Sequence, residues 1–355
     1  MKKLKDLLFS SKTRSRTVSF ALVIAVYIIC QAMIAAGSMK RMMIALLIPV
    51  CCYAVAAIGL NLNVGISGEL NLGQAGFMSV GGFSAAVVSQ WISASVTNEP
   101  LRLLIAIVVG AVIAGLIGWL ISIPVLKLQG DYLAIVTLAF GQIIMSIVNN
   151  LYIGYDSKGI HMSFVNNTLS LAEGGKMVVS GPMGTASVAT ISTFTAGIIL
   201  ILVSLYIVYS LMYSKSGRAI MACRDNRIAA ETVGINVSKT KTLAFVLSSA
   251  LGGAAGALYV LNYASVAATK FNFNTSILIL VYIVLGGLGN MTGTLVATTL
   301  LVVLPEVLRF LSGYRMLIYA IVLILIMLIT NNPKIAVMVE KTKQKFAKKG
   351  AAEND

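Results

Sequence analysis

The sequence predicts an all-α polytopic membrane protein with about ten transmembrane helices. Of its 355 residues, 58% are hydrophobic and only 11% are charged, whereas soluble domains average about 45–50% apolar and about 25% charged residues. Apolar runs of about 17–25 residues, the length that crosses a bilayer as a helix, recur along the chain. These observations exclude an intrinsically disordered chain and argue against a soluble enzyme.

The apolar runs predict one transmembrane domain over residues 17–332, with short basic tails at 1–16 and 333–355. The region 275–311 is either two spans or one broken helix with a re-entrant piece, because Gly286, Gly287 and Gly289 interrupt it. The predicted spans are, in order, 17–37, 42–62, 76–96, 101–124, 132–150, 192–213, 242–265, 275–288, 291–311 and 316–332.

Positive charge predicts that both ends of the chain are cytoplasmic. The two tails, Lys127 and the inner loop 214–241 together hold 19 of the 27 Lys and Arg residues, as the positive-inside rule requires of inner segments. Ends on the same side need an even number of spans, and ten spans satisfy this. We therefore interpret the net charge of +15 as membrane topology facing anionic lipid, and we expect no nucleic-acid partner.

No candidate catalytic residue or metal site is found in the sequence. His161 is the one histidine, and no cysteine pair has C-x-x-C spacing, so the usual metal-ligand patterns are missing. Gly175-Lys176 is followed by Met177 rather than by the Ser or Thr of a nucleotide-binding loop. We expect no enzymatic activity, no metal and no cofactor in this chain.

Two connections are long, an outer loop at 151–191 and the inner loop at 214–241. The pattern of capping residues within the inner loop predicts two short helices there. Asp225 or Asn226 can cap a helix over 227–233 by accepting free backbone N–H groups, and Gly234 suits the left-handed residue that ends a helix. Ser216 can begin an earlier helix in the same way.

This inner loop fits two interpretations. It is either a solvated basic loop near lipid headgroups or a docking helix for a cytoplasmic partner. In the second case the small residues Ala229 and Ala230 permit close approach, while Arg224 and Glu231 supply charged anchors.

Polar residues alternate with glycines and apolar residues between 59 and 76. So many glycines weaken a straight helix, and irregular backbone at membrane depth persists only where it is buried in protein or lines a cavity. The segment 61–74 is thus either part of a translocation path or its gate, or an inner loop in water. The candidate path or gate residues are Asn61, Asn63, Glu69, Asn71, Gln74 and Asp131. For Asp131 we favour a second role, as the N-cap of the span that begins at Tyr132.

Four stretches of the chain resemble one known family. Residues 59–83 resemble the first signature region of ABC permeases for branched-chain amino acids, and 130–141 resemble the signature of the LivM type. Residues 217–235 resemble the loop that contacts the ATPase in this family, and 285–293 resemble its late glycine motif. The similarity runs in order through most of the chain.

This resemblance implies a type II-like ABC importer permease with two halves of inverted topology in the bacterial cytoplasmic membrane. It implies four partners: a second permease of LivH type, two cytoplasmic ATPases of LivG and LivF type that bind ATP and Mg, and an extracytoplasmic substrate-binding protein. The residues that it places in ATPase coupling are Gly217, Arg218, Arg224, Asp225, Ala229, Ala230, Glu231 and Gly234.

The predicted function is translocation of leucine, isoleucine and valine. Gln142 and Met145 depart from the more charged pattern of the family, so the substrate has alternatives: an ABC permease for urea, short amides or simple sugars. A more distant alternative is an ion-coupled secondary transporter, although such proteins carry ionisable residues inside the membrane. Here the predicted spans hold few, chiefly Glu306 and Arg309.

Overall fold

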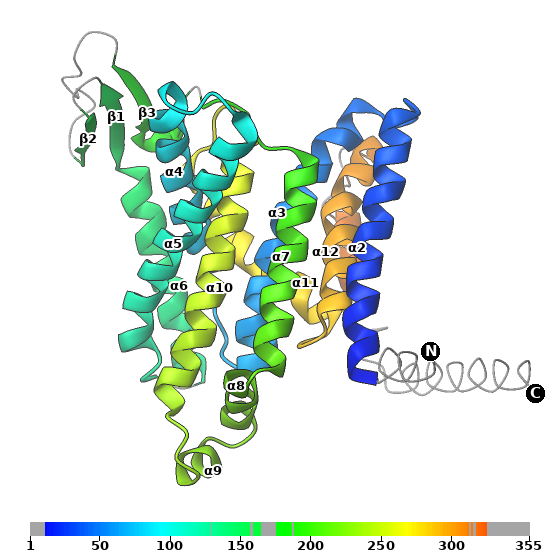
Figure 1. Cartoon of the computed structure of the whole chain (residues 1–355), viewed down its shortest axis with the longest axis vertical. Helices are drawn as coiled ribbons and strands as arrows, with labels where there is room; N and C mark the ends of the chain where they lie inside the picture. Colours follow the sequence, from blue (N-terminus) through cyan, green and yellow to red (C-terminus); the bar gives the residue numbers. More distant parts are fainter. Residues whose placement is uncertain are drawn as a thin grey trace, which may run out of the picture. The chain divides into compact units, whose positions relative to one another are not determined.

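The computed structural model describes residues 11–128, 130–156, 159–164, 175–186, 188–311, 314 and 317–324. The chain divides into two compact units, residues 1–299 and 300–355. The first is a bundle of helices with one small sheet (Figure 1). The second contains the end of the last long helix, a 3₁₀ turn at Leu308–Leu311 and helical residues at 317–324.

The helices follow the predicted spans closely from the first to the ninth. Six of them are long and apolar enough to cross a membrane, so the chain is a multi-pass membrane protein. The predicted span 316–332 is only partly described, and the count of ten stays a prediction. The helices are α2 (Ser11–Ala35), α3 (Arg41–Asn61), α4 (Gln74–Trp91), α5 (Glu99–Val125), α6 (Asp131–Asn149), α7 (Phe194–Tyr213), α8 (Lys215–Asp225), α9 (Arg227–Thr232), α10 (Val237–Val260), α11 (Phe273–Gly286) and α12 (Met291–Val307).

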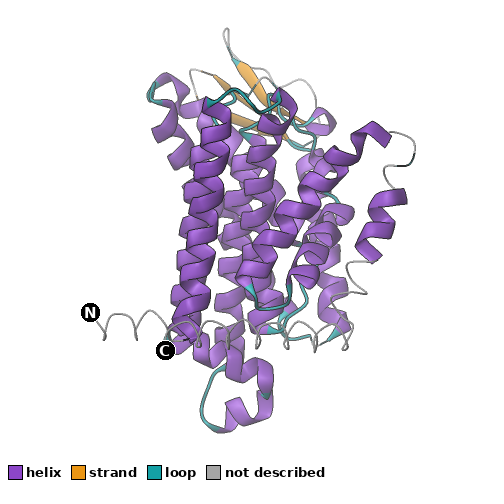
Figure 2. Ribbon diagram, turned by 90° about the vertical axis from the view of Figure 1, so that its right-hand side faces the viewer, coloured by secondary structure: helices purple, strands orange, loops and turns teal. Residues whose placement is uncertain are grey.

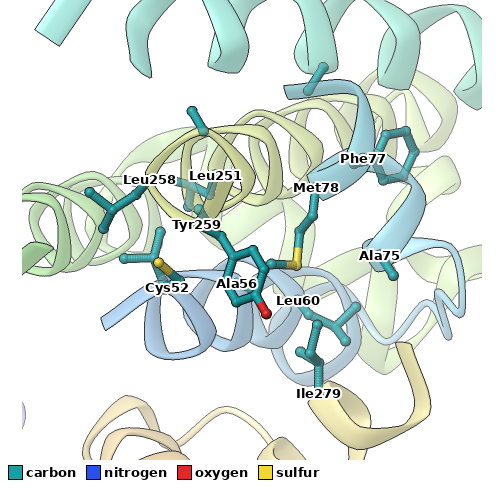
Figure 3. Packing of buried hydrophobic residues seen from close by; sticks show 14 of the residues in the cluster. Cys52, Ala56, Leu60, Ala75, Phe77, Met78, Leu251, Leu258, Tyr259 and Ile279 are labelled. Carbon is teal, nitrogen blue, oxygen red and sulfur yellow. The ribbon is translucent and has the colours of Figure 1, made fainter. Parts of the chain in front are cut away.

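Helix α10 lies at the centre of the first unit and packs against α3, α4 and α5. Figure 3 shows its residues Leu251 and Leu258 among side chains from α3 and α4. Glycines permit the close approach: a Cβ at Gly81 of α4 would overlap the backbone of Gly253 in α10. The small residues of α4 and α10 thus allow two apolar helices to pack closely.

Helix α3 does not end at Asn61 but continues as a π-helix, η1 (Leu62–Ser67). Gly68 then takes a left-handed conformation, with φ of 74°. The ion pair of Glu69 with Lys241 places this turn beside the first turns of α10. We call this the α8–α9 end of the bundle, because α8 and α9 directly precede α10.

Helix α4 begins halfway through the bundle. The Nε2 atom of Gln74, its first residue, donates to the carbonyl of Ser248, in the middle of α10, at 3.3 Å. Residues 68–73 are not helical and lead from the α8–α9 end to this level. From there α4 runs beside the second half of α10, since Gly82 packs against Gly256.

Helix α11 also begins near this level. The backbone N–H of Ala75 in α4 donates to Ser276 Oγ in the first turn of α11 at 3.0 Å. From there α11 runs to the α8–α9 end, where the turn after it reaches Asn61 through Gly289. Residues 287–290 separate α11 from α12, so the 275–311 region forms two helices of 14 and 17 residues.

The opposite end of the bundle carries a three-stranded antiparallel sheet, within the segment that the sequence analysis treats as a plain outer loop. Its strands are β1 (Tyr152–Asp156), β2 (Gly159–Ser163) and β3 (Lys176–Ser180), in the order β2-β1-β3. We call this the sheet end. Figure 2 shows the sheet and the α8–α9 pair at opposite ends of the first unit.

Candidate functional site

The loop between α7 and α10 is an ordered pair of short helices, each with a side-chain cap. Ser214 Oγ accepts from the N–H of Gly217 at 3.1 Å, so the cap of α8 lies two residues before the predicted Ser216. Asn226 Oδ1 accepts from the N–H of Ala229 at 3.0 Å, and Gly234 has φ of 83°. The predicted cap and the left-handed end of the second helix are therefore confirmed, while the predicted start at Ser216 is wrong.

Residues of this loop divide into an inward and an exposed set. Ala230 is 3% exposed and packs with Cys223 and Val237, and a Cβ at Gly217 would overlap the carbonyl of Leu211. These small residues pack within the loop, and their part in ATPase coupling stays a prediction.

The exposed set contains two apolar residues that the sequence analysis missed. Ile228 and Val233 on and beside α9 are 75% and 74% exposed. They flank the exposed ion pair between Arg227 and Glu231, whose Nε and Oε1 atoms lie 3.1 Å apart. Large apolar side chains in an otherwise polar loop are the signal that could have identified them, because exposed apolar patches commonly mark contact sites.

Arg224 connects the inner loop 214–241 to the π-helix after α3. Its Nη1 donates to the backbone carbonyl of Gly65 in η1 at 3.0 Å. Its Nη2 lies 2.9 Å from Oδ1 of Asp225. A Cβ at Gly68 would lie only 2.6 Å from Arg224 Cγ, so the arginine stem packs directly against this turn.

Gly65 is in turn in contact with the turn after α11. A Cβ at Gly65 would overlap both Asn61 Oδ1 and the backbone of Gly289. Asn61 Oδ1 accepts from the N–H of Gly289 at 2.9 Å, and its Nδ2 donates to Thr294 Oγ1 at 2.8 Å. Contacts therefore run without a break from Arg224 in α8 through Gly65 to α12.

Glu69 forms an ion pair with Lys241 of α10. Their side chains are 12% and 14% exposed, so both charges are largely withdrawn from water. Arg224 and this pair line one cleft of about 250 Å³ at the α8–α9 end. The interpretation of Glu69 as a residue simply in water is therefore wrong.

The remaining polar residues of the 61–74 segment are fully buried inside the subunit. Gln74 bonds the carbonyls of Ala56 and Ser248, and Asn71 Oδ1 accepts from Gly73 N–H at 2.9 Å. Other buried atoms have no partner among the described residues: both amide atoms of Asn63, Ser67 Oγ, Asn71 Nδ2 and Gln74 Oε1. Buried polar groups are nearly always hydrogen-bonded, so several unpartnered polar atoms within one short segment are uncommon. A π-helix, which is itself frequent at functional sites, lies in the same segment.

Asp131 follows Gly130, which lines the same cleft as Glu69 and Arg224. It is exposed and is the first residue of α6. Gly130, with φ of 58°, occupies the cap position, and no side chain caps the helix. The predicted capping role is therefore wrong. The acid still lies in the first helical turn, where negative charge is favourable.

The described residues present an exposed helical loop and a buried polar segment. Among the described residues no three His, Cys, Asp or Glu side chains come together as metal ligands. Burial raises the pKa of the Cys223 thiol, which makes it a poor nucleophile because the thiolate is the reactive form.

Comparison with known proteins gives the class of this chain. Residues 42–330 match the family described as "Branched-chain amino acid transport system / permease component". The chain belongs to this family of membrane permeases. No solved structure matches it.

Individual relatives agree with this class. The chain is 32% identical over 287 residues to the "High-affinity branched-chain amino acid transport system permease protein LivM" of Salmonella typhimurium, covering 78% of this chain and 66% of the relative. It is also 32% identical over 286 residues to the LivM protein of Escherichia coli, which again covers 78% of this chain and 66% of the relative. A "Probable branched-chain amino acid transport permease protein LivH" of Methanocaldococcus jannaschii is 28% identical over 78% of this chain and 84% of that protein. The chain thus spans about two thirds of the length of the LivM relatives.

Proposed function

We propose that this chain is a permease subunit of an ATP-binding-cassette importer that carries leucine, isoleucine and valine across the bacterial cytoplasmic membrane. The observation that carries the proposal is the 32% identity to two LivM proteins over most of this chain. The proposed assembly contains a LivH-type permease, two ATPases of LivG and LivF type that bind ATP and Mg, and an extracytoplasmic binding protein. Both chain ends face the cytoplasm, as does the α8–α9 end.

In the proposed mechanism, α8 and α9 dock on the ATPases and carry their movement to the membrane. Ile228 and Val233 are the apolar contacts of the docking surface, and Glu231 and Arg227 are charged residues beside them. Arg224 then transmits displacement of α8 to Gly65 through their hydrogen bond. The motion changes the packing around 61–74, which we propose as the path or gate. The ATPases supply the free energy, and this chain supplies no hydrolytic residue.

Two interrupted segments support the proposed inverted halves. Residues 68–73 lead to α4 from the α8–α9 end, while 262–272 lead to α11 from the sheet end. The two helices begin beside each other at Ala75 and Ser276. Discontinuous helices that meet near the midplane are typical of transporters built from inverted repeats.

The first experiment is uptake of labelled leucine in a strain that lacks only this chain. Uptake should fall in the deletion strain and return with the gene, and unlabelled isoleucine and valine should compete in the parent strain. Urea and ribose should not compete. Unchanged leucine uptake, with no other leucine transporter present, would contradict the substrate class; competition by urea or ribose would favour the other ABC permeases.

A further inference from the structure

A second cleft lies at the sheet end, beside the segment that leads to α11. It has a volume of about 400 Å³ and is lined by Tyr259, Tyr263, Ser265, Val266, Thr269 and Lys270, among others. This volume is within the range of about 300–1,000 Å³ found for small-molecule sites. The proposed topology places the cleft on the outer face of the membrane, where substrate arrives.

We propose that this cleft is an entry site for the free amino acid, in which Lys270 binds its α-carboxylate and the tyrosine rings contact its apolar side chain. The inference rests on the proposed function and adds a substrate-contact site to it.

The charge of the cleft suits a carboxylate. Lys270 is exposed, and no carboxylate among the described residues pairs with it or lines the cleft. An ammonium group beside low-dielectric aromatic walls attracts a carboxylate more strongly than one in open water. The hydroxyl groups of Ser265 and Thr269 can accept hydrogen bonds from the ammonium group of the same molecule.

The apolar wall suits a branched side chain. Tyr259 is 7% exposed and its ring centroid lies 5.2 Å from that of Tyr263, which is 38% exposed and also lines the cleft. The ring of Tyr259 also contacts the ring of Tyr53 in α3, with 5.9 Å between the centroids. Tyr53 in turn contacts Tyr282 of α11, with 6.3 Å between the centroids.

The cleft is built on a fixed segment. Val266 N–H donates to Thr185 Oγ1 at 2.9 Å, and Thr185 N–H donates to Val266 O at 3.0 Å. On the other side, Thr275 Oγ1 donates to the carbonyl of Lys270 at 2.7 Å. A fixed segment limits the ordering cost of binding. The same segment ends at α11, whose first turn meets α4 at Ala75, so the cleft opens beside the interrupted helices.

The test uses the complete transporter in lipid nanodiscs, without ATP, and a diazirine analogue of leucine as photo-crosslinker. We expect crosslinks on peptides covering 259–270, competed by leucine and isoleucine but not by leucinol, which lacks the carboxylate. Lys270→Gln should lower this labelling about tenfold, because a charge-assisted hydrogen bond is lost. Lys176→Gln, a change at another exposed lysine of the sheet end, is the matched control and should leave labelling unchanged.

Tyr263→Ala should also lower labelling, whereas Tyr263→Phe should retain it. Crosslinks elsewhere, equal competition by leucinol, or equal labelling of Lys270→Gln would overturn the proposal. If Lys270→Gln instead weakens only binding-protein association, Lys270 belongs to that docking surface and the entry site is likewise rejected.

ATP-driven leucine uptake by the same preparation separates the two proposals. Uptake without labelling of 259–270 rejects the entry site and leaves the permease function standing. Absence of leucine uptake in a preparation whose ATPases are active contradicts the proposed function itself.

Discussion

The Nη1 atom of Arg224 lies 3.0 Å from the backbone carbonyl oxygen of Gly65, a residue 159 positions earlier in the chain. One residue belongs to the exposed helical loop and the other to the π-helix that ends α3. Since Gly65 also packs against Asn61 and Gly289, this bond joins the loop to the end of α3 and to the turn between α11 and α12.

Replacing Arg224 should therefore uncouple ATP hydrolysis from transport. We expect Arg224→Ala to lower leucine uptake about tenfold, as expected for loss of a hydrogen bond from a charged donor. ATP hydrolysis by the assembled complex should fall much less. The measurement is the ratio of uptake to ATP hydrolysis in proteoliposomes.

Lys215→Ala is the matched control, since Lys215 is an exposed cation of the same helix α8 and lies outside the residues assigned to ATPase coupling. It should leave the ratio near that of the unmodified protein. A normal ratio for Arg224→Ala would exclude the Arg224–Gly65 bond as the route of coupling.

The buried ion pair gives a stability prediction. Glu69→Gln leaves Lys241 without its partner, and such a change typically destabilises by about 3–5 kcal/mol. We expect a clear drop in Tm of the purified protein, largely restored by adding Lys241→Met. Glu231→Gln breaks an exposed pair, which is worth about 0.2–1 kcal/mol, and should barely change Tm. Equal effects of the two single variants would disprove the role of burial.

The docking surface predicts a specific loss of assembly. Ile228→Asp together with Val233→Asp should abolish copurification of the ATPase subunits, because assembly would then bury two unpaired carboxylates, which is strongly unfavourable. Met183 is 76% exposed near the sheet, and Met183→Asp should leave the complex intact. Retention of the ATPases by the double variant would show that they dock elsewhere.

Two glycine-to-alanine substitutions in different helices should differ clearly in their effect on thermal stability. Gly81→Ala places a methyl group in the backbone of Gly253, whereas a Cβ at Gly115 meets Ala250 Cβ at an ordinary 3.4 Å. We expect Gly81→Ala to destabilise by at least about 1–3 kcal/mol. Gly115→Ala should be neutral or slightly stabilising, because alanine favours a helix by about 0.5–1 kcal/mol. Thermal unfolding in detergent compares them, and similar Tm values would contradict the packing.

Cys223 should react slowly with maleimides in the isolated chain. Its side chain is buried and burial raises its pKa, so less thiolate is present at neutral pH than for an ordinary cysteine. The labelling rate of Cys223 should level off at a higher pH than the rate of a cysteine introduced by Ser216→Cys, an exposed position on α8. Mass spectrometry of the labelled peptides gives both rates; coincident pH profiles would refute the expectation.

The sequence alone determined the class of protein, the approximate positions of its first nine apolar helices and the two ends of the second helix in the inner loop. Hydropathy over about twenty residues suffices to identify a span. The cap at Asn226 and the left-handed Gly234 were predictable because each acts within a few residues of chain. The resemblance of four stretches was enough to name the family that the comparison then confirmed.

The tertiary structure alone decided which residues meet. Asn61, Glu69 and Gln74 are close in sequence, yet each has a different partner. Asn61 bonds to Thr294 of α12, and Glu69 pairs with Lys241 of α10. Gln74 bonds to backbone carbonyls of α3 and α10. The start of α4 halfway through the bundle, the partner of Arg224 and the sheet of three five-residue strands depend on contacts between distant segments. Local periodicity carries no information on such pairs, because the free energy that fixes them comes from packing and hydrogen bonds between helices rather than within them.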